Sequence, residues 1–463
     1  MNLQSISMTK IIGFVASVAA AALLAPGAGA QDLIHKAAPQ TRPIVIEHAT
    51  IHTVSSGVIH DGSLWFSGGV IRGIARPGES LVGSFPASPI RINAAGMHVY
   101  PGLVSGMTGL GLTEISAVNM TNDSNEQGAN TPEVKAVVAI NPDSTLFPVA
   151  RSNGVLVAGV APGGGTIAGR AGVVRLDGWT WEDMTINDNV GLVISWPRLV
   201  PFRSPFLPAS FNAKAQLKRS KETLSRIDAL FDEAEAYFAA RDADPSIPTD
   251  VRLDALRSAI EGTSRVFIQA SEMEQIESAV SWAVKRGLKP VIVGGNDAPK
   301  VAALLKRHDV PVMLSGALRT PSRRDSPYDE AFTAPIALQE AGVAWCISSG
   351  GGASNERNLP YQAAASVAYG LDPDAALRAI TLSTAEILGV DDAYGSIDEG
   401  KSATLFLADG DILDVRTHVL DAFIDGRRID LRNKQTALRD KYRDKYRQLG
   451  LIQTSGDQSG SGG

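Results

Sequence analysis

Short, almost wholly apolar runs recur through the middle of this 463-residue chain, each bounded by polar residues or glycine. They lie at residues 154–158, 265–268, 290–293, 310–314 and 342–347. Continuous runs of this length are typical of strands that are buried on both faces of a parallel sheet. Helical patterns at 273–285 and 298–307 separate some of them. Repeated strand–helix units predict a parallel sheet of the α/β class, and enough of them close into a (β/α)8 barrel.

The segments on either side of this region have a different pattern. Ile44–Ile46 and Thr50–Val54 are rich in β-branched residues and predict a small antiparallel β unit near the N-terminus. The strand pattern returns at 403–407 and 419–424. Within the central region, residues 213–241 carry apolar side chains at helical spacing, which predicts a long amphipathic helix facing the core.

The first thirty residues have the features of a signal peptide. Lys10 supplies a positive charge, Ile11–Leu24 is apolar but short for a bilayer span, and Ala28–Ala30 is a small-residue cleavage pattern before Gln31. A membrane anchor or a buried helix is the alternative. We therefore expect a periplasmic or secreted protein with no transmembrane anchor after cleavage. Cys346 is the single cysteine, so the chain can form no internal disulfide.

Gly96–Val104, Ala376–Thr381 and Ala385–Gly389 follow one another along the chain in a distinctive order. They resemble segments of the amidohydrolase superfamily, in particular its exported imidazolonepropionase-like and dihydroorotase-like branch. The first is similar to the family's entry into the first barrel strand, and the other two are similar to its final barrel helix. Gly395–Leu405 and Asp425–Gly426 are similar to its return into a β domain. The resemblance implies a (β/α)8 TIM-like barrel with a flanking β-sandwich formed by N- and C-terminal segments.

This layout divides the chain into consecutive parts. We expect a signal peptide (1–30), an N-terminal part of the β-sandwich (31–100), the barrel (101–390), a C-terminal part of the sandwich (391–432), a C-terminal helix (433–452) and a disordered tail (453–463).

The resemblance also implies metal chemistry, namely hydrolysis of non-peptide C–N bonds in amides or cyclic amides with zinc or another divalent ion. In the family, histidines after strands one, five and six and an aspartate after strand eight hold the metal. The corresponding positions here are Met107, Gly109, Gln269, Gly294 and Gly350. A thioether, a carboxamide and glycine are not zinc ligands. We therefore expect no bound metal and no other cofactor, as in a pseudoenzyme with a degenerate metal site.

Three carboxylates follow the first predicted barrel strand. Glu114, Asp123 and Glu126 would face the barrel mouth there, where they would bind substrate or a hard cation through oxygen. An Asx-rich surface loop is the alternative interpretation.

Two further segments are candidates for the pocket. Residues 161–170 form a Gly-rich stretch ending in Arg170, which would cradle an anion or simply make a tight turn. Ser349 lies in a Ser/Gly run without a neighbouring base, so it is a weak candidate for a nucleophile.

Three hypotheses for function follow. The first is a pseudoenzyme that binds a small molecule or supports an active amidohydrolase paralogue, or a second copy of itself, as a partner. The second is an active C–N hydrolase with a rearranged site, and the third is a structural envelope protein. The net charge of −6 offers no basic surface for nucleic acid.

Overall fold

The computed structural model describes residues 34–81, 85, 87–201, 212–321, 323–350 and 352–452. The predicted signal peptide and the predicted disordered tail lie outside these residues. None of the helices in the described part of the chain is both long enough and apolar enough to cross a membrane. The architecture below belongs to the compact unit that begins at Lys36.

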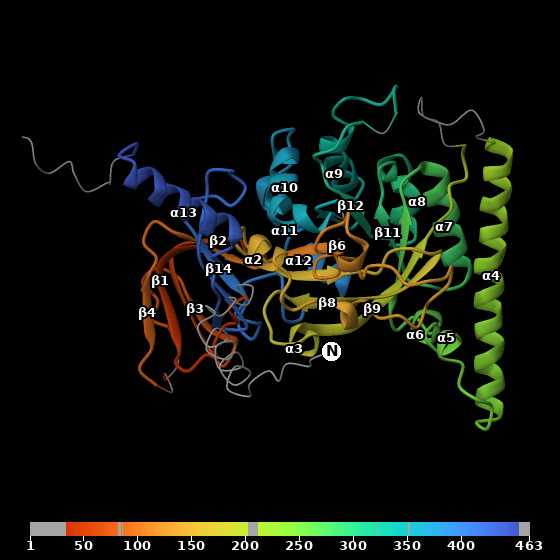
Figure 1. Ribbon diagram of the computed structural model, residues 1–463, viewed down its shortest axis with the longest axis horizontal. Helices are drawn as coiled ribbons and strands as arrows, with labels where there is room; N and C mark the ends of the chain where they lie inside the picture. The colour runs from red at the N-terminus through yellow and green to blue at the C-terminus, as the bar shows by residue number, and fades with distance from the viewer. Residues whose placement is uncertain are drawn as a thin grey trace, which may run out of the picture. The chain divides into compact units, whose positions relative to one another are not determined.

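Eight strands form the central sheet, with the order β13-β12-β11-β10-β9-β8-β7-β6. Figure 1 labels β6, β8, β9, β11 and β12 of this sheet. They are β6 (Leu103–Thr108), β7 (Val155–Val160), β8 (Ile167–Arg175), β9 (Thr185–Ser195), β10 (Arg265–Ala270), β11 (Pro290–Gly294), β12 (Val312–Ser315) and β13 (Trp345–Ser348). The end strands β6 and β13 approach closely, because a Cβ built on Gly106 would lie 3.1 Å from the Ser348 Cβ. The sheet is therefore a nearly closed barrel, as the apolar runs predict.

One barrel strand departs from the parallel arrangement. β8 pairs antiparallel with both β7 and β9, whereas the remaining neighbours pair in parallel. Residues 161–166 connect β7 to β8. A connection this short permits a hairpin, since a parallel crossover needs about a dozen residues or more.

Helices cover the outside of the barrel. They are α2 (Leu146–Arg151), α3 (Trp181–Met184), α4 (Ala213–Ala243), α5 (Val251–Asp254), α6 (Arg257–Ile260), α7 (Met273–Lys285), α8 (Ala302–Arg307), α9 (Glu330–Glu340), α10 (Leu359–Val367), α11 (Pro373–Ala379) and α12 (Leu382–Leu388). Short 3₁₀ turns are η1 (Asn119–Thr121), η2 (Ala136–Ala139), η3 (Ala298–Val301) and η4 (Ala353–Asn358). The resemblance implies one final barrel helix over Ala376–Thr381 and Ala385–Gly389, but the structure has the two helices α11 and α12 there. The chain breaks at Ile380, whose carbonyl accepts a hydrogen bond from Val104 N at 2.9 Å.

The long helix α4 confirms the prediction of a core-facing amphipathic helix. Its buried face includes Ile227, Phe231 and Ala234, which follow helical spacing. Arg286, at the end of α7, forms ion pairs with three carboxylates of α4, those of Asp228, Asp232 and Glu235. These contacts hold α4 against α7.

The strands from both ends of the chain form a second, separate sheet. They are β1 (Ile44–His52), β2 (Val58–Ser67), β3 (Val70–Ala75), β4 (Ile90–Asn93), β5 (His98–Pro101), β14 (Leu405–Ala408), β15 (Val419–Ile424) and β16 (Arg427–Arg428), followed by helix α13 (Lys434–Gln448). The sheet is mixed rather than antiparallel, because β1 pairs in parallel with β4 and β5. It is one sheet that curls back on itself, since Val70 bridges to Ser402, just before β14.

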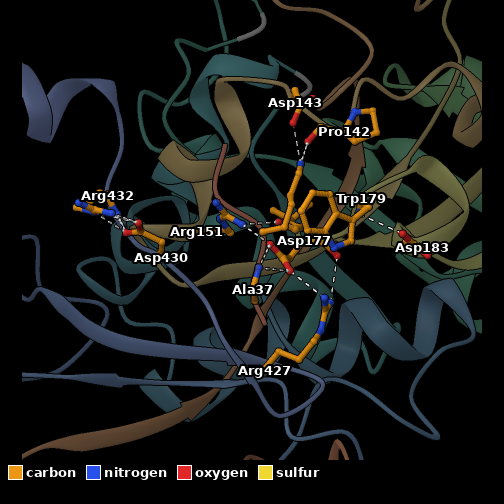
Figure 2. A network of polar contacts seen from close by, with 12 residues as sticks. Ala37, Pro142, Asp143, Arg151, Asp177, Trp179, Asp183, Arg427, Asp430 and Arg432 are labelled. Carbon is orange, nitrogen blue, oxygen red and sulfur yellow. Dashed lines mark hydrogen bonds and ion pairs between the residues drawn. The ribbon is translucent and has the colours of Figure 1, made fainter. Parts of the chain in front are cut away.

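A buried carboxylate joins this mixed sheet to the barrel (Figure 2). The Asp177 carboxylate, fully buried, pairs with Arg151 of α2 at 3.0 Å and with Arg427 of β16 at 3.1 Å. It also accepts a hydrogen bond from the backbone N–H of Ala37 at 3.3 Å. Segments from the beginning, middle and end of the chain therefore meet at one side chain.

Candidate ligand pocket

The carboxyl ends of the barrel strands surround a cavity of about 650 Å³. Its walls come from the ends of β6, β10, β11, β12 and β13 and from the loops that follow them. The lining residues are Met107, Thr108, Gly109, Thr113, Glu114, Ser116, Asn122, Ser124, Leu146, Ala161, Pro162, Gly163, Arg198, Gln269, Ala270, Ser271, Gln275, Val293, Gly294, Ser315, Ser348, Gly350, Gly352, Ala353 and Ser354. Barrel enzymes build their active sites at this end.

All five positions that the resemblance assigns to metal-holding residues line this one cavity. Met107 and Gly109 lie at the end of β6, Gln269 near the end of β10, Gly294 at the end of β11 and Gly350 after β13. Residues far apart in the sequence therefore meet at one cavity.

The side chains present do not form a set of zinc ligands. Of the described residues that line the cavity, Glu114 is the single carboxylate, and none is histidine or cysteine. Across the described part of the chain, no three His, Cys, Asp or Glu side chains are grouped to hold a metal ion. Most polar lining side chains are instead hydroxyls and carboxamides, which suit hydrogen bonding to a neutral ligand.

The backbone at the end of β11 is also unsuited to a ligand side chain. Gly294 has φ of +106°, and a Cβ there would lie 2.6 Å from the Ser271 Oγ. L-residues rarely adopt such a φ, and the contact is too short for a carbon. At Gly109, by contrast, the nearest atom to an added Cβ is the Thr113 Oγ1 at 3.9 Å.

The three candidate carboxylates after β6 separate in the structure. Glu114 reaches the cavity wall, and its Oε2 accepts hydrogen bonds from the Thr145 N–H and hydroxyl, both at 3.2 Å. Its Oε1 is buried without a hydrogen-bond partner among the described residues. Asp123 and Glu126 are exposed and are not among the lining residues. The turn that places Asn122 and Ser124 inward directs Asp123 outward.

The Gly-rich loop and Arg170 do not form an anion cradle at the cavity. The backbone N–H groups of Gly163 and Thr166 donate to the carbonyls of Ser124 and Ala129, both at 2.6 Å. Arg170 lies within β8, and its guanidinium donates to the Glu133 carbonyl at 2.8 Å. The loop therefore secures the segment that follows β6, as expected of a structural turn.

Ser349 is hydrogen-bonded to Glu356, a buried residue that the sequence did not single out. Its hydroxyl donates to the Glu356 carboxyl at 2.5 Å, and the Ser105 hydroxyl of β6 donates to the other oxygen. Glu356 is 1% exposed, and burial raises the pKa of its carboxyl, although hydrogen bonds from Ser105, Ser349 and Thr108 oppose the rise. The carboxyl lies behind the cavity wall and joins the two end strands of the barrel. A glutamate in a Gly/Ser/Asn-rich segment gives no sequence signal of burial.

The cavity wall also contains the cation of Arg198 and the carboxamide of Gln269. Arg198 pairs with Glu272 at 2.8 Å. Gln269 is exposed into the cavity, and its Oε1 accepts from the Ser195 hydroxyl at 2.8 Å. The wall thus offers fixed dipoles and a paired cation.

Comparison with known proteins agrees with the fold. Residues 254–431 match the model of the amidohydrolase family. Amidohydrolase tasK of Hapsidospora irregularis is 23% identical over 406 residues, covering 79% of this chain and 40% of that protein. The chain therefore spans less than half the length of this curated relative.

Solved structures are similar over most of the chain. An amidohydrolase from Thermotoga maritima matches with a TM-score of 0.73 and 22% identity, over 84% of this chain and all of that one. A molinate hydrolase matches with a TM-score of 0.51 and 15% identity, over 86% and 96% of the two chains. At these identities the likeness concerns the fold alone.

Proposed function

We propose that this chain is a member of the amidohydrolase superfamily, that it binds a small polar molecule in the barrel cavity, and that it has lost the metal-assisted hydrolysis of the family; the match of residues 254–431 to the family model and the shared fold support the membership. One observation carries the proposal. The five residues that correspond to the family's metal-holding positions all line one cavity, namely Met107, Gly109, Gln269, Gly294 and Gly350. Hydrolysis by the family requires about three protein ligands to a catalytic metal, and these residues do not provide them.

The cavity chemistry supports a particular class of ligand. Hydroxyls and carboxamides both donate and accept hydrogen bonds, so a neutral molecule with several hydroxyl or amide groups would satisfy them. The volume of about 650 Å³ lies within the range of roughly 300–1,000 Å³ that is typical of small-molecule sites. Export to the periplasm, and pairing with an active paralogue or a second copy, are further parts of the proposal.

Metal binding provides the test. The chain from Gln31 onward is purified after export, incubated with zinc, dialysed, and measured by mass spectrometry for metal and by calorimetry for zinc binding. We expect less than one equivalent of zinc and no rise in melting temperature. One or more equivalents held after dialysis, and lost when Met107 or Gln269 is changed to alanine, would contradict the proposal.

One observation favours a second candidate, an active C–N hydrolase with a rearranged site. The Glu114 Oε1 is buried at the cavity wall without a hydrogen-bond partner in the described chain. A bound cation, or a hydrogen bond from a substrate N–H, would satisfy this oxygen. If Glu114 acts in this way, Glu114→Gln abolishes any amidase activity while the fold, measured by circular dichroism, is kept.

A further inference from the structure

A second cavity, of about 390 Å³, lies at the opposite end of the barrel, where β10, β12 and β13 begin. Its walls come from these strand beginnings and from helices α11 and α12. The lining residues include Arg265, Pro311, Val343, Trp345, Glu386 and Ile387. Packing usually fills this end of a barrel, which serves stability.

Arg265, the first residue of β10, places a half-buried cation at this cavity. Its guanidinium donates to the Glu386 main-chain carbonyl at 3.3 Å. Within the described chain, no carboxylate lies within ion-pair distance of it, and burial lowers its pKa although the negative charge of Asp391 opposes the change. The Glu386 carboxylate is already paired, with Arg378 at 2.6 Å. Arg265 therefore keeps donors for a further acceptor.

The rest of the wall is mainly apolar. Trp345, Val343 and Ile387 are buried and face the cavity with Pro311. A partly desolvated guanidinium beside apolar side chains is stabilised when a carboxylate pairs with it, most strongly through two parallel N–H···O bonds. An apolar group attached to that carboxylate would remain against the tryptophan and the aliphatic side chains.

We propose that this cavity binds a small organic anion, with its carboxylate on Arg265 and its apolar body against Trp345 and Ile387. The volume lies at the lower end of the roughly 300–1,000 Å³ that small-molecule sites occupy, which favours a compact aryl or branched alkyl carboxylate. The site is separate from the cavity at the other end of the barrel and does not depend on the function proposed for it.

Calorimetry on the full chain with two matched probes tests the site. Phenylacetate carries the carboxylate, and phenylacetamide is its neutral analogue of the same shape. We expect phenylacetate to bind at least about tenfold more tightly, since hydrogen bonds to charged groups contribute on the order of 1.5–3 kcal/mol. Equal binding of the two probes, or no binding of phenylacetate, overturns the proposal without any variant.

Variants then locate the binding. Arg265→Gln should weaken phenylacetate about tenfold or more, and Arg265→Lys should weaken it less. Arg416→Gln is the matched control, because Arg416 is exposed and pairs with Asp414 outside the cavity. Trp345→Phe should remove the change in tryptophan fluorescence that phenylacetate causes. Unchanged affinity in a folded Arg265→Gln protein, or an unchanged fluorescence response in Trp345→Phe, refutes the assigned location.

Discussion

Replacing Glu356 should show whether its carboxyl holds the barrel closed. The side chain is buried behind the cavity wall, and it joins Ser105 of β6 to Ser349 after β13. Glu356→Ala removes these hydrogen bonds and leaves buried hydroxyls unsatisfied. Because each of the two stranded hydroxyls costs about 1–3 kcal/mol, we expect a loss of about 2–6 kcal/mol in the free energy of unfolding.

The pH dependence gives a sharper expectation for the same carboxyl. Its pKa is raised in the folded protein, chiefly by burial, so the native state binds more protons than the unfolded state. This stabilising contribution is complete below the unfolded pKa of about 4.3 and is lost as the pH rises through the higher folded pKa. Stability should therefore fall with pH in that window, by up to about 1.4 kcal/mol per pH unit.

Glu356→Gln keeps the shape and removes the titration. We expect this variant to lose about 1 kcal/mol at low pH and to lack the additional fall at higher pH. The assay is urea unfolding followed by circular dichroism from pH 4 to 9. The control is Glu340→Gln, an exposed carboxylate at the end of α9, which should change stability by less than about 0.5 kcal/mol. If Glu356→Ala costs under 1 kcal/mol, or Glu356→Gln keeps the wild-type pH slope, the reasoning is wrong.

Asp177 and the two glycines Gly294 and Gly109 are tested by urea unfolding, and Arg286 by hydrogen exchange. Asp177→Ala should cost about 3–5 kcal/mol, because it leaves the buried Arg151 guanidinium without its carboxylate; a loss under 1 kcal/mol contradicts this. Gly294→Ala should cost about 2 kcal/mol or more from its positive φ and short contact, whereas Gly109→Ala stays within about 0.5 kcal/mol; equal effects would refute the comparison. Arg286→Ala should loosen α4 and raise hydrogen exchange along that helix, and unchanged exchange would show that apolar packing alone holds it.

The sequence predicted those barrel strands whose residues are apolar because the strand is buried. The runs at β10, β11 and β13 are apolar because both faces are covered, and that pattern is visible without any contacts. Strand β8 was not predicted, because its sequence, IAGRAGVVR, is rich in glycine and alanine and resembles a loop. β8 runs antiparallel to β7 because the connection between them is too short for a parallel crossover. The sequence indicates this direction only if β8 is first recognised as a strand.

The site was harder to predict, because it depends on which loop residues turn inward. The positions at strand ends, such as Gln269, were assigned through the resemblance to the family. Glu114 and Asp123 belong to one loop of similar composition, yet only Glu114 reaches the cavity. The burial of Glu356 depends on Ser105, 251 residues away in the chain, and no local pattern records that contact.

Glu356 also bears on how a barrel of this kind keeps its end strands together. In the family pattern, one metal centre draws groups from strands one, five, six and eight to a common point. In this chain the hydroxyls of Ser105 in β6 and of Ser349, directly after β13, donate to one buried carboxyl. Burial raises the pKa of this carboxyl, and the hydrogen bonds that it accepts from the two hydroxyls oppose the rise. The chain's own side chains therefore cross-link the two end strands of the barrel beside the cavity wall.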